Sequence, residues 1–361
     1  MRRRLIAEIG SANGNIDYAL DAVDAFAAAG AWAIKGQLYT AATLVTREAV
    51  PYGKGLSEPD TQWEAFEDAL SYDEWGIVAE YCDALGVRFF GSVFDLDAVR
   101  AGVDQNWSAL KIASADITYR PLLEAAAATG MHTILSTGAA TGAEILRAAD
   151  LFDNLTLLAC TLSYPCPHTE ANVSRVTTLK ELYDSVGYSD HTRGLAAADY
   201  AFRIGADYVE KHVTLTPGEG GDHDFAVTPS DVERLVTGGV ALTPVGDALV
   251  AGDPWIGPRP VEIGARHGAR RSWTALTDLK AGDELTMENV GALRPAARFR
   301  RSRPRVPGRR SISIPKLSPA ESSPVEACVP DSTTSSARWC GRSASATEYG
   351  GSSVSATATW V

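Results

Sequence analysis

Short apolar runs alternate with longer segments rich in alanine and leucine through the first 212 residues of the chain. Several of the longer segments end at a glycine that leads into the next apolar run, as in AAAGAWAIK, DALGVRFF and AATGMHTIL. Glycine commonly closes a helix in the left-handed conformation, so this pattern predicts a helix, a glycine and then a strand. The predicted strands cover residues 5–9, 31–35, 87–93, 109–114, 132–137, 155–161, 185–189 and 207–212.

Eight such units within about 240 residues match a (β/α)8 TIM barrel of the α/β class, in which helices cover a parallel sheet. A doubly wound open sheet is the alternative. Barrel enzymes carry their active sites at the C-terminal ends of the strands and on the loops that follow. The residues that end the apolar runs are therefore the candidates for chemistry.

Polar and ionisable residues end most of these runs. Lys35 and Lys111 lie in otherwise apolar runs, where an unpaired ammonium group would cost several kcal/mol, so each needs an anionic partner. With the hydroxyl groups of Ser114, Ser136 and Ser189 they would form a pocket for a phosphate or carboxylate. For any single residue a solvated loop is the simpler interpretation, but their coincidence on one rim favours a site. The other polar strand ends include Glu8, Gln37, Ser92, Tyr164 and Glu210.

Two histidines, His191 and His212, fall at the ends of the seventh and eighth predicted strands. Neighbouring strands lie about 4.8 Å apart, so both imidazoles could reach one ion. With a carboxylate such as Glu8 or Asp222 and open water positions, they would suit a divalent metal that acts as a Lewis acid. The alternative is that both are hydrogen-bonded core histidines.

The charge and composition of the chain argue against some classes of binding partner. The 361 residues carry a net charge of −12, which argues against nucleic acid as the main partner. The apolar start of the chain is broken at Glu8, and no apolar stretch approaches the roughly 20 residues of a membrane span, so we expect no signal peptide and no membrane partner. Five scattered cysteines fit a reducing compartment, and the expected location is the cytoplasm.

Several motifs together resemble one known family. They are AEIGSANG at 7–14, IKGQ at 34–37, LKIASAD at 110–116, VGYSDHT at 186–192 and GADYVEKHVTL at 205–215. These segments, with SVFD, ILSTG, YPCP and GGDHDF between and after them, resemble the N-acetylneuraminate (sialic acid) synthase family, including its legionaminate, pseudaminate and spore-coat relatives. VGYSDHT followed by VEKH is the most specific part of the likeness, and IKGQ alone would be weak.

The resemblance implies a C–C bond-forming transferase that condenses phosphoenolpyruvate with an N-acetylated aldose on a (β/α)8 barrel, with manganese or magnesium as cofactor. By motif, His191 and His212 would be the metal ligands, and Glu8, Glu210 and Lys111 the catalytic groups. The implied substrate-binding residues are Lys35, Ser92, Ser114, Ser136 and Ser189 for phosphoenolpyruvate, and Gln37, Tyr164, Asp222 and Arg294 for the sugar. A non-catalytic sugar-binding or pyruvate-binding descendant and a metal-dependent pyruvate aldolase are the alternatives.

The chain departs from the family pattern near the expected sugar. The family's histidine after EIG is absent, and only Asn13 could replace the polar pair. Leu162 stands where a polar residue is expected, and Ala159 replaces a histidine or glutamine before Cys160. These changes leave the reaction type in place and bear on which sugar is accepted.

The sequence also predicts a division of the chain. Residues 1–245 would form the barrel, 246–265 a linker, and 266–296 the first half of an antifreeze-like (SAF) domain. In the family this domain enters the partner's active site in a domain-swapped homodimer, where Arg294 would meet the neighbour's sugar. Residues 297–361 have the composition of an irregular tail, interpreted either as a basic arm for an acidic partner or as an out-of-frame reading of a GC-rich gene.

Overall fold

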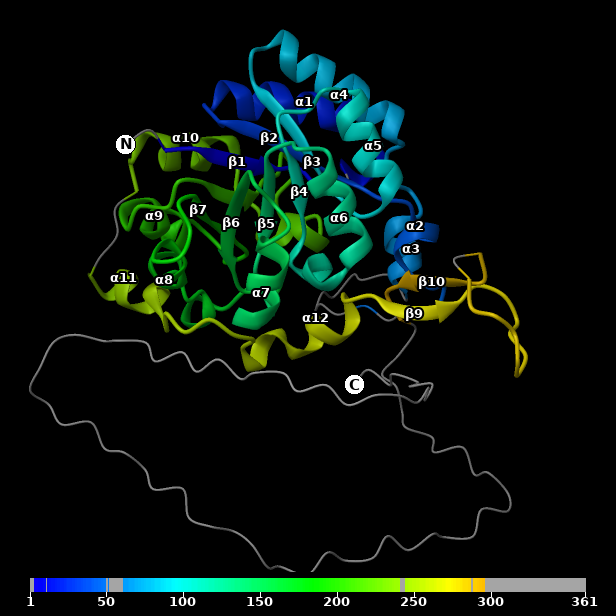
Figure 1. Ribbon diagram of the computed structural model, residues 1–361. Helices are drawn as coiled ribbons and strands as arrows, with labels where there is room; N and C mark the ends of the chain where they lie inside the picture. Colours follow the sequence, from blue (N-terminus) through cyan, green and yellow to red (C-terminus); the bar gives the residue numbers. More distant parts are fainter. Residues whose placement is uncertain are drawn as a thin grey trace, which may run out of the picture. The chain divides into compact units, whose positions relative to one another are not determined.

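Eight parallel strands close into a barrel in which each strand pairs with the next and β8 pairs with β1 (Figure 1). This confirms the expected fold class, and the open-sheet alternative is wrong. The computed structural model describes residues 3–10, 12–49, 51, 61–240, 244–286 and 288–295. The barrel strands are β1 (Leu5–Glu8), β2 (Ala33–Leu38), β3 (Arg88–Val93), β4 (Leu110–Ile112), β5 (Thr133–Ser136), β6 (Leu155–Cys160), β7 (Val186–Asp190) and β8 (Val209–His212).

Helices cover the outside of the barrel, and their ends follow local sequence signals. Ser71 and Thr141 cap the starts of α4 and α7, where Glu74 and Glu144 complete capping boxes. Each of these boxes satisfies backbone N–H groups that a helix start leaves without partners. The covering helices are α1 (Ile16–Ala28), α4 (Tyr72–Ala84), α5 (Leu96–Asp104), α6 (Arg120–Ala128), α7 (Gly142–Ala149), α8 (Arg175–Lys180), α9 (Ala196–Arg203) and α10 (Pro229–Thr237).

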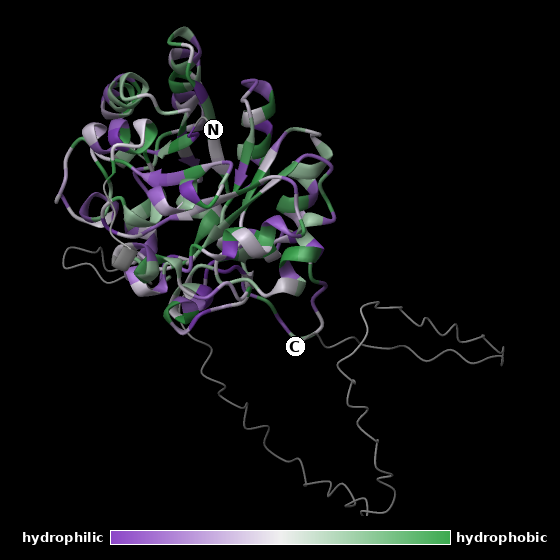
Figure 2. Ribbon diagram, turned by 90° about the vertical axis from the view of Figure 1, so that its left-hand side faces the viewer, coloured by the Kyte–Doolittle hydropathy of each residue, from purple (hydrophilic) through white to green (hydrophobic). Residues whose placement is uncertain are grey.

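The core lies inside the barrel and between the strands and the helices. Ile6, Ile34, Leu110 and Leu157 have no exposed surface. Burial of each such side chain stabilises the fold by roughly 1.5–3 kcal/mol. Figure 2 shows hydrophobic residues concentrated in the central strands, while the outer helices also carry hydrophilic ones. The apolar runs of the sequence thus form a rigid frame for the polar residues at their ends.

The chain continues after the barrel along one end of it, from α11 through α12 to β9 (Figure 1). Part of the predicted linker is helical, because α11 (Pro244–Ala251) extends into it. This helix packs against α9. Strands β9 and β10 form an antiparallel pair. The backbone of Arg294 bonds to the loop after β2, through Leu44 O at 2.9 Å and Thr46 N at 3.1 Å. The added elements are α2 (Ala41–Leu44), α3 (Gln62–Phe66), α11 (Pro244–Ala251), the 3-10 turn η5 (Pro260–Glu262), α12 (Ile263–Gly268), β9 (Ser272–Ala275) and β10 (Val290–Leu293).

Some predictions fall outside the described residues. They concern the tail at 297–361, with Cys328 and Cys340, and the side chain of Asn13. Within the described part of the chain, the helices are all too short or too polar to cross a bilayer. Cys82, Cys160 and Cys166 are buried free thiols, as expected.

Candidate active site

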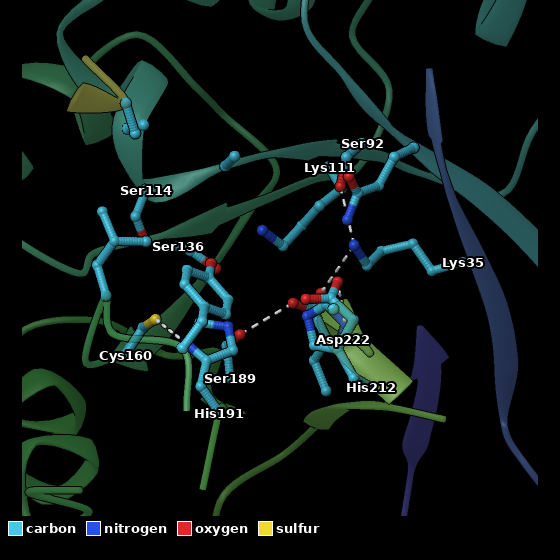
Figure 3. A pocket seen from close by; sticks show the side chains of 18 of the residues that line it. Lys35, Ser92, Lys111, Ser114, Ser136, Cys160, Ser189, His191, His212 and Asp222 are labelled. Carbon is cyan, nitrogen blue, oxygen red and sulfur yellow. Dashed lines mark hydrogen bonds and ion pairs between the residues drawn. The ribbon is translucent and has the colours of Figure 1, made fainter. Parts of the chain in front are cut away.

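A cavity of about 270 Å³ opens at the C-terminal ends of the barrel strands. Figure 3 shows side chains from many strands pointing into it. All of the predicted site residues except Glu8 line this cavity. They are Lys35, Gln37, Ser92, Lys111, Ser114, Ser136, Tyr164, Ser189, His191, Glu210, His212, Asp222 and Arg294. The expectation that strand ends far apart in the sequence meet at one place is therefore confirmed.

Lys35 lies at one side of the cavity, inside β2 rather than at its end. Its ammonium group donates to Ser92 Oγ at 2.8 Å, forms an ion pair with Glu8, and lies 3.6 Å from Glu210 Oε2. Burial alone would lower the pKa of Lys35, but the carboxylates of Glu210 and Glu8 outweigh it and raise that pKa. Lys35 is thus a permanent positive charge in the cavity wall.

Glu8 is the one predicted site residue that does not line the cavity. It is buried and forms an ion pair with Lys35, which does line it. Its Oε1 accepts from the backbone N–H of Gly10 at 2.8 Å and from Gln37 Nε2 at 3.1 Å. A carboxylate held in this way can fix the positions of Lys35 and Gln37.

Lys111 supplies the second buried ammonium group, which donates to the backbone oxygen of Ile112 at 3.0 Å. Burial lowers the pKa of Lys111, although the carboxylate of Glu210 opposes this effect. Glu210 also accepts a hydrogen bond from Ser189 Oγ at 2.9 Å. Burial would raise the pKa of Glu210, but Lys111 and Lys35 hold it below its usual value, so it is ionised at neutral pH.

The hydroxyl group of Ser136 lines the cavity and could hydrogen-bond to a ligand. Ser136 Oγ is buried and has no hydrogen-bond partner among the described residues. A buried hydroxyl group without a partner is costly, so this position calls for a polar atom in the cavity. Across the same space lie Lys35, Lys111 and Ser114 (Figure 3). The group suits a phosphate or carboxylate, since it combines two ammonium groups with free hydroxyl hydrogen-bonding capacity.

His191 and His212 come together as the strand ends predict, with ring centroids 5.7 Å apart. His191 Nδ1 donates to the backbone oxygen of Thr161 at 2.9 Å, and His212 Nδ1 donates to Asp222 Oδ2 at 3.0 Å. Burial and the neighbouring His212 lower the pKa of His191 to about 4. For His212, burial lowers the pKa but the Asp222 carboxylate outweighs this effect and raises it.

The histidine pair fits part of a metal site. Each ring has Nδ1 engaged by an oxygen, which is the usual arrangement of metal-binding histidines and leaves Nε2 for the ion. Within the described residues no group of three His, Cys, Asp or Glu side chains is placed to hold a metal. Asp222 serves as the partner of His212 here. The two imidazoles could therefore hold a divalent ion only if substrate or water supplied the other ligands.

Another wall of the cavity carries an arginine and two phenylalanine rings. The guanidinium of Arg294 is buried, 5.6 Å from the rings of both Phe66 and Phe94. In this single chain it lines the cavity of its own barrel, where the resemblance implied the neighbouring subunit's site. This aromatic wall suits a ligand with both apolar and hydrogen-bonding groups. Tyr164 lies beside the histidine pair, with its ring tilted against His191 and the two centroids 4.1 Å apart.

Sequence reasoning missed several lining residues. Tyr39 and Phe94 directly follow β2 and β3, Phe66 ends α3 between those strands, and Arg193 and Asp224 come from the segments after β7 and β8. None of them belongs to a periodic apolar pattern. The position of each loop just after a strand was the signal that could have found them, because these loops form the rim of a barrel site.

Comparisons with known proteins agree with this geometry. The model of the NeuB family matches residues 22–245. The N,N'-diacetyllegionaminic acid synthase of Legionella pneumophila is 32% identical over 308 residues, covering 81% of this chain and 85% of that protein. The pseudaminic acid synthase of Helicobacter pylori is 33% identical over 310 residues, covering 81% and 88%.

Solved structures show the same fold. The spore coat polysaccharide biosynthesis protein SpsE of Bacillus subtilis superposes with a TM-score of 0.66 at 26% identity, covering 81% of this chain and 84% of that one. The N-acetylneuraminic acid synthetase of Leptospira borgpetersenii, solved in complex with citrate, gives a TM-score of 0.59 at 30% identity, with coverage of 73% and 89%.

Proposed function

The chain belongs to the NeuB family, and from this premise we propose that it is a sialic-acid-synthase-type enzyme. The proposed reaction condenses phosphoenolpyruvate with an open-chain N-acetylated amino sugar to give a nonulosonic acid and inorganic phosphate. The names of its relatives, which include legionaminic and pseudaminic acid synthases, support this reaction class. The observation that carries the proposal is the pair of buried ammonium groups, Lys35 and Lys111, beside the histidine pair in one cavity.

The phosphate and carboxylate of phosphoenolpyruvate would bind between the two lysines. Lys35 stays protonated because two carboxylates face it, whereas burial and the neighbouring Lys35 lower the pKa of Lys111 more than Glu210 and Glu8 raise it. A doubly anionic ligand would therefore stabilise the protonated form of Lys111. The same ligand would give Ser136 Oγ the hydrogen-bond partner that it lacks among the described residues. The hydroxyl groups of Ser92, Ser114 and Ser189 line the same space.

The sugar would bind between the histidine pair and the aromatic wall. His191 and His212 would hold a divalent ion, manganese or magnesium, which when bound supplies Lewis-acid polarisation of the sugar's carbonyl oxygen. Asp222 would keep His212 in the tautomer that offers Nε2. Arg294, Gln37 and Tyr164 would contact the hydroxyl and acetamido groups.

Glu210 is the group we propose for proton transfer. C3 of the enol ester adds to the aldehyde carbon, water adds to C2, and phosphate leaves by cleavage of its C–O bond. The water must lose one proton, and the new hydroxyl group of the sugar chain must gain one. The second proton of that water leaves with the phosphate as C2 becomes the ketone. Glu210 is ionised and lines the cavity, so it can accept the first proton and return it for the second.

Phosphate release from phosphoenolpyruvate tests this function. We expect release that requires both an N-acetylated sugar and added manganese, with N-acetylmannosamine and bacterial deoxy-diacetamido sugars as the acceptors to screen. A non-catalytic binder would release no phosphate with any of them. A pyruvate aldolase would form product from pyruvate and sugar without phosphoenolpyruvate. Either of these results would overturn the proposal.

A further inference from the structure

Glu262 is a completely buried carboxylate on the segment that joins the barrel to β9. It lies outside the cavity, and the proposed function gives it no role. Its Oε1 accepts from two backbone N–H groups of the barrel rim, Ala139 at 2.6 Å and Leu162 at 2.7 Å. Its Oε2 accepts from Arg259 N at 2.7 Å. A buried charge with three donors is fully engaged, so these contacts set the position of both rim loops.

The bond to Leu162 reaches the histidine pair through a single peptide group. The N–H of Leu162 and the C=O of Thr161 belong to the same planar unit. On one edge the N–H donates to Glu262, and on the other edge the C=O accepts from His191 Nδ1 at 2.9 Å. Donation to an anion polarises the peptide and makes its oxygen a stronger acceptor. Glu262 therefore favours the His191 tautomer with a proton on Nδ1 and a free Nε2.

The bond to Ala139 holds the neighbouring loop. Ala139 has a φ of +53°, a left-handed conformation that is strained for any residue with a side chain. The preceding residue, Gly138, donates its N–H to the hydroxyl oxygen of Ser114 at 2.9 Å. The same carboxylate oxygen thus fixes two loops at once, one that orients His191 and one that orients Ser114.

The joining segment has a second attachment that does not depend on Glu262. Arg175 is buried and donates to the backbone oxygens of Trp255 at 3.1 Å and Gly257 at 2.8 Å, and also to Cys160 O at 3.1 Å. Removal of the Glu262 carboxylate should therefore leave the segment attached to the end of β6. The main effect would be the loss of the hydrogen bonds from the backbone N–H groups of Ala139 and Leu162.

We propose that Glu262 is a positioning residue that orients His191 through the Thr161–Leu162 peptide and keeps the rim loops in the shape that the cavity needs. The role in metal binding rests on the proposed function, while the orientation of His191 does not. Glu262 acts at a distance from the substrate, through backbone groups. Glu262 lies in the segment that the sequence predicts to be a linker.

The test compares Glu262→Ala and Glu262→Gln with the control Glu144→Gln. The control removes another carboxylate that anchors the same segment, through Arg266 and Arg270, but it touches no peptide next to His191. The glutamine at 262 keeps one oxygen for Ala139 and Leu162, so it should rescue part of the effect. The readouts are the ¹⁵N shifts of the His191 ring in metal-free protein, manganese affinity from the spin-resonance signal of the free ion, and the kinetics.

For Glu262→Ala we expect the His191 ring to lose its preference for the Nδ1–H tautomer and the dissociation constant for manganese to rise about tenfold. We also expect kcat to fall more than KM for phosphoenolpyruvate changes. Glu262→Gln should lie between the alanine variant and the wild type, and Glu144→Gln should match the wild type in tautomer and manganese affinity.

Unchanged His191 shifts in folded Glu262→Ala, or an equal change in Glu144→Gln, would overturn the inference. If the alanine variant does not fold, the glutamine variant decides. A wild-type Arg259 N–H shift in Glu262→Gln would show that the amide oxygen faces Arg259 and that the amide NH2 faces Ala139 and Leu162. Wild-type His191 shifts in that variant would then also overturn the inference. If the wild type binds no manganese and releases no phosphate, the proposed function fails, and the ring shifts still decide the role of Glu262.

Discussion

Glu8 and Lys35 face each other across β1 and β2 in direct register and form an ion pair with almost no solvent exposure. The pair explains how a barrel interior tolerates an ammonium group that could bind an anionic ligand. Burial would lower the pKa of Lys35, but Glu210 and Glu8 supply counter-charges that raise it, so Lys35 stays protonated before any ligand binds. Lys35 therefore presents a protonated ammonium group to the cavity in the unliganded protein.

Replacement of Glu8 by glutamine should destabilise the protein, because it leaves a buried charge with only the more distant Glu210 nearby. We expect the free energy of unfolding to fall by about 3 kcal/mol, measured by urea denaturation at pH 7. The exposed pair of Asp97 and Arg100 is the control. Arg100→Ala should cost less than about 1 kcal/mol. Equal losses of unfolding free energy in Glu8→Gln and Arg100→Ala would show that burial does not make the Glu8–Lys35 pair more important than an exposed pair.

Lys111→Ala should weaken binding of phosphoenolpyruvate far more than binding of the sugar. A charged hydrogen bond is worth about 1.5–3 kcal/mol, so KM for phosphoenolpyruvate should rise roughly tenfold to a hundredfold. Initial rates of phosphate release at varied concentration of each substrate measure the two constants separately. A rise in KM for the sugar alone would show that Lys111 is not part of the site that binds phosphoenolpyruvate.

His191→Ala and His212→Ala should each reduce turnover about a thousandfold, since Lewis-acid polarisation is worth several kcal/mol. A chelator should have the same effect on the wild type, and added manganese should reverse it. Binding of phosphoenolpyruvate, followed by calorimetry, is the control, because its lysine pocket stays intact. Full turnover in either variant would refute the metal assignment.

The sequence predicted the barrel and most of the cavity because both follow from short-range signals. Lys35 and Lys111 were visible as charges in apolar runs, and the position of His212 followed from the end of a strand. Glu262 gave no such signal, since its two partners on the barrel rim are backbone groups that lie 123 and 100 residues away in the chain. A contact of this kind depends on how the chain after the barrel returns to the rim, which periodicity does not specify.

Glu8 shows a second limit of the sequence. Strand register decides that Glu8 lies opposite Lys35, and side-chain direction then decides that its carboxylate pairs with the ammonium group. A position at a strand end predicts closeness to the site, but it does not predict whether a side chain lines the cavity or pairs with a neighbour that does. The catalytic role expected of Glu8 stays a prediction.

Acid should weaken the attachment of α12 to the barrel through Glu144. This carboxylate caps α7 and accepts from Arg266 and Arg270. Burial would raise its pKa, but the two arginines and the Thr141 N–H lower that pKa to about 2. A carboxyl whose pKa is lowered on folding adds stability above its unfolded value, and that stability is lost as the pH falls toward the folded value.

The comparison of wild type with Glu144→Gln isolates this effect. Since the side chain is partly solvated, we expect the wild type to be more stable by about 2 kcal/mol at pH 7. The difference should stay constant down to about pH 5 and shrink steadily below it, because a protonated carboxyl resembles the amide. Urea denaturation between pH 7 and pH 3 measures it. A difference that is independent of pH over this range would show that the amide disturbs packing, and that the ion pairs with Arg266 and Arg270 contribute little.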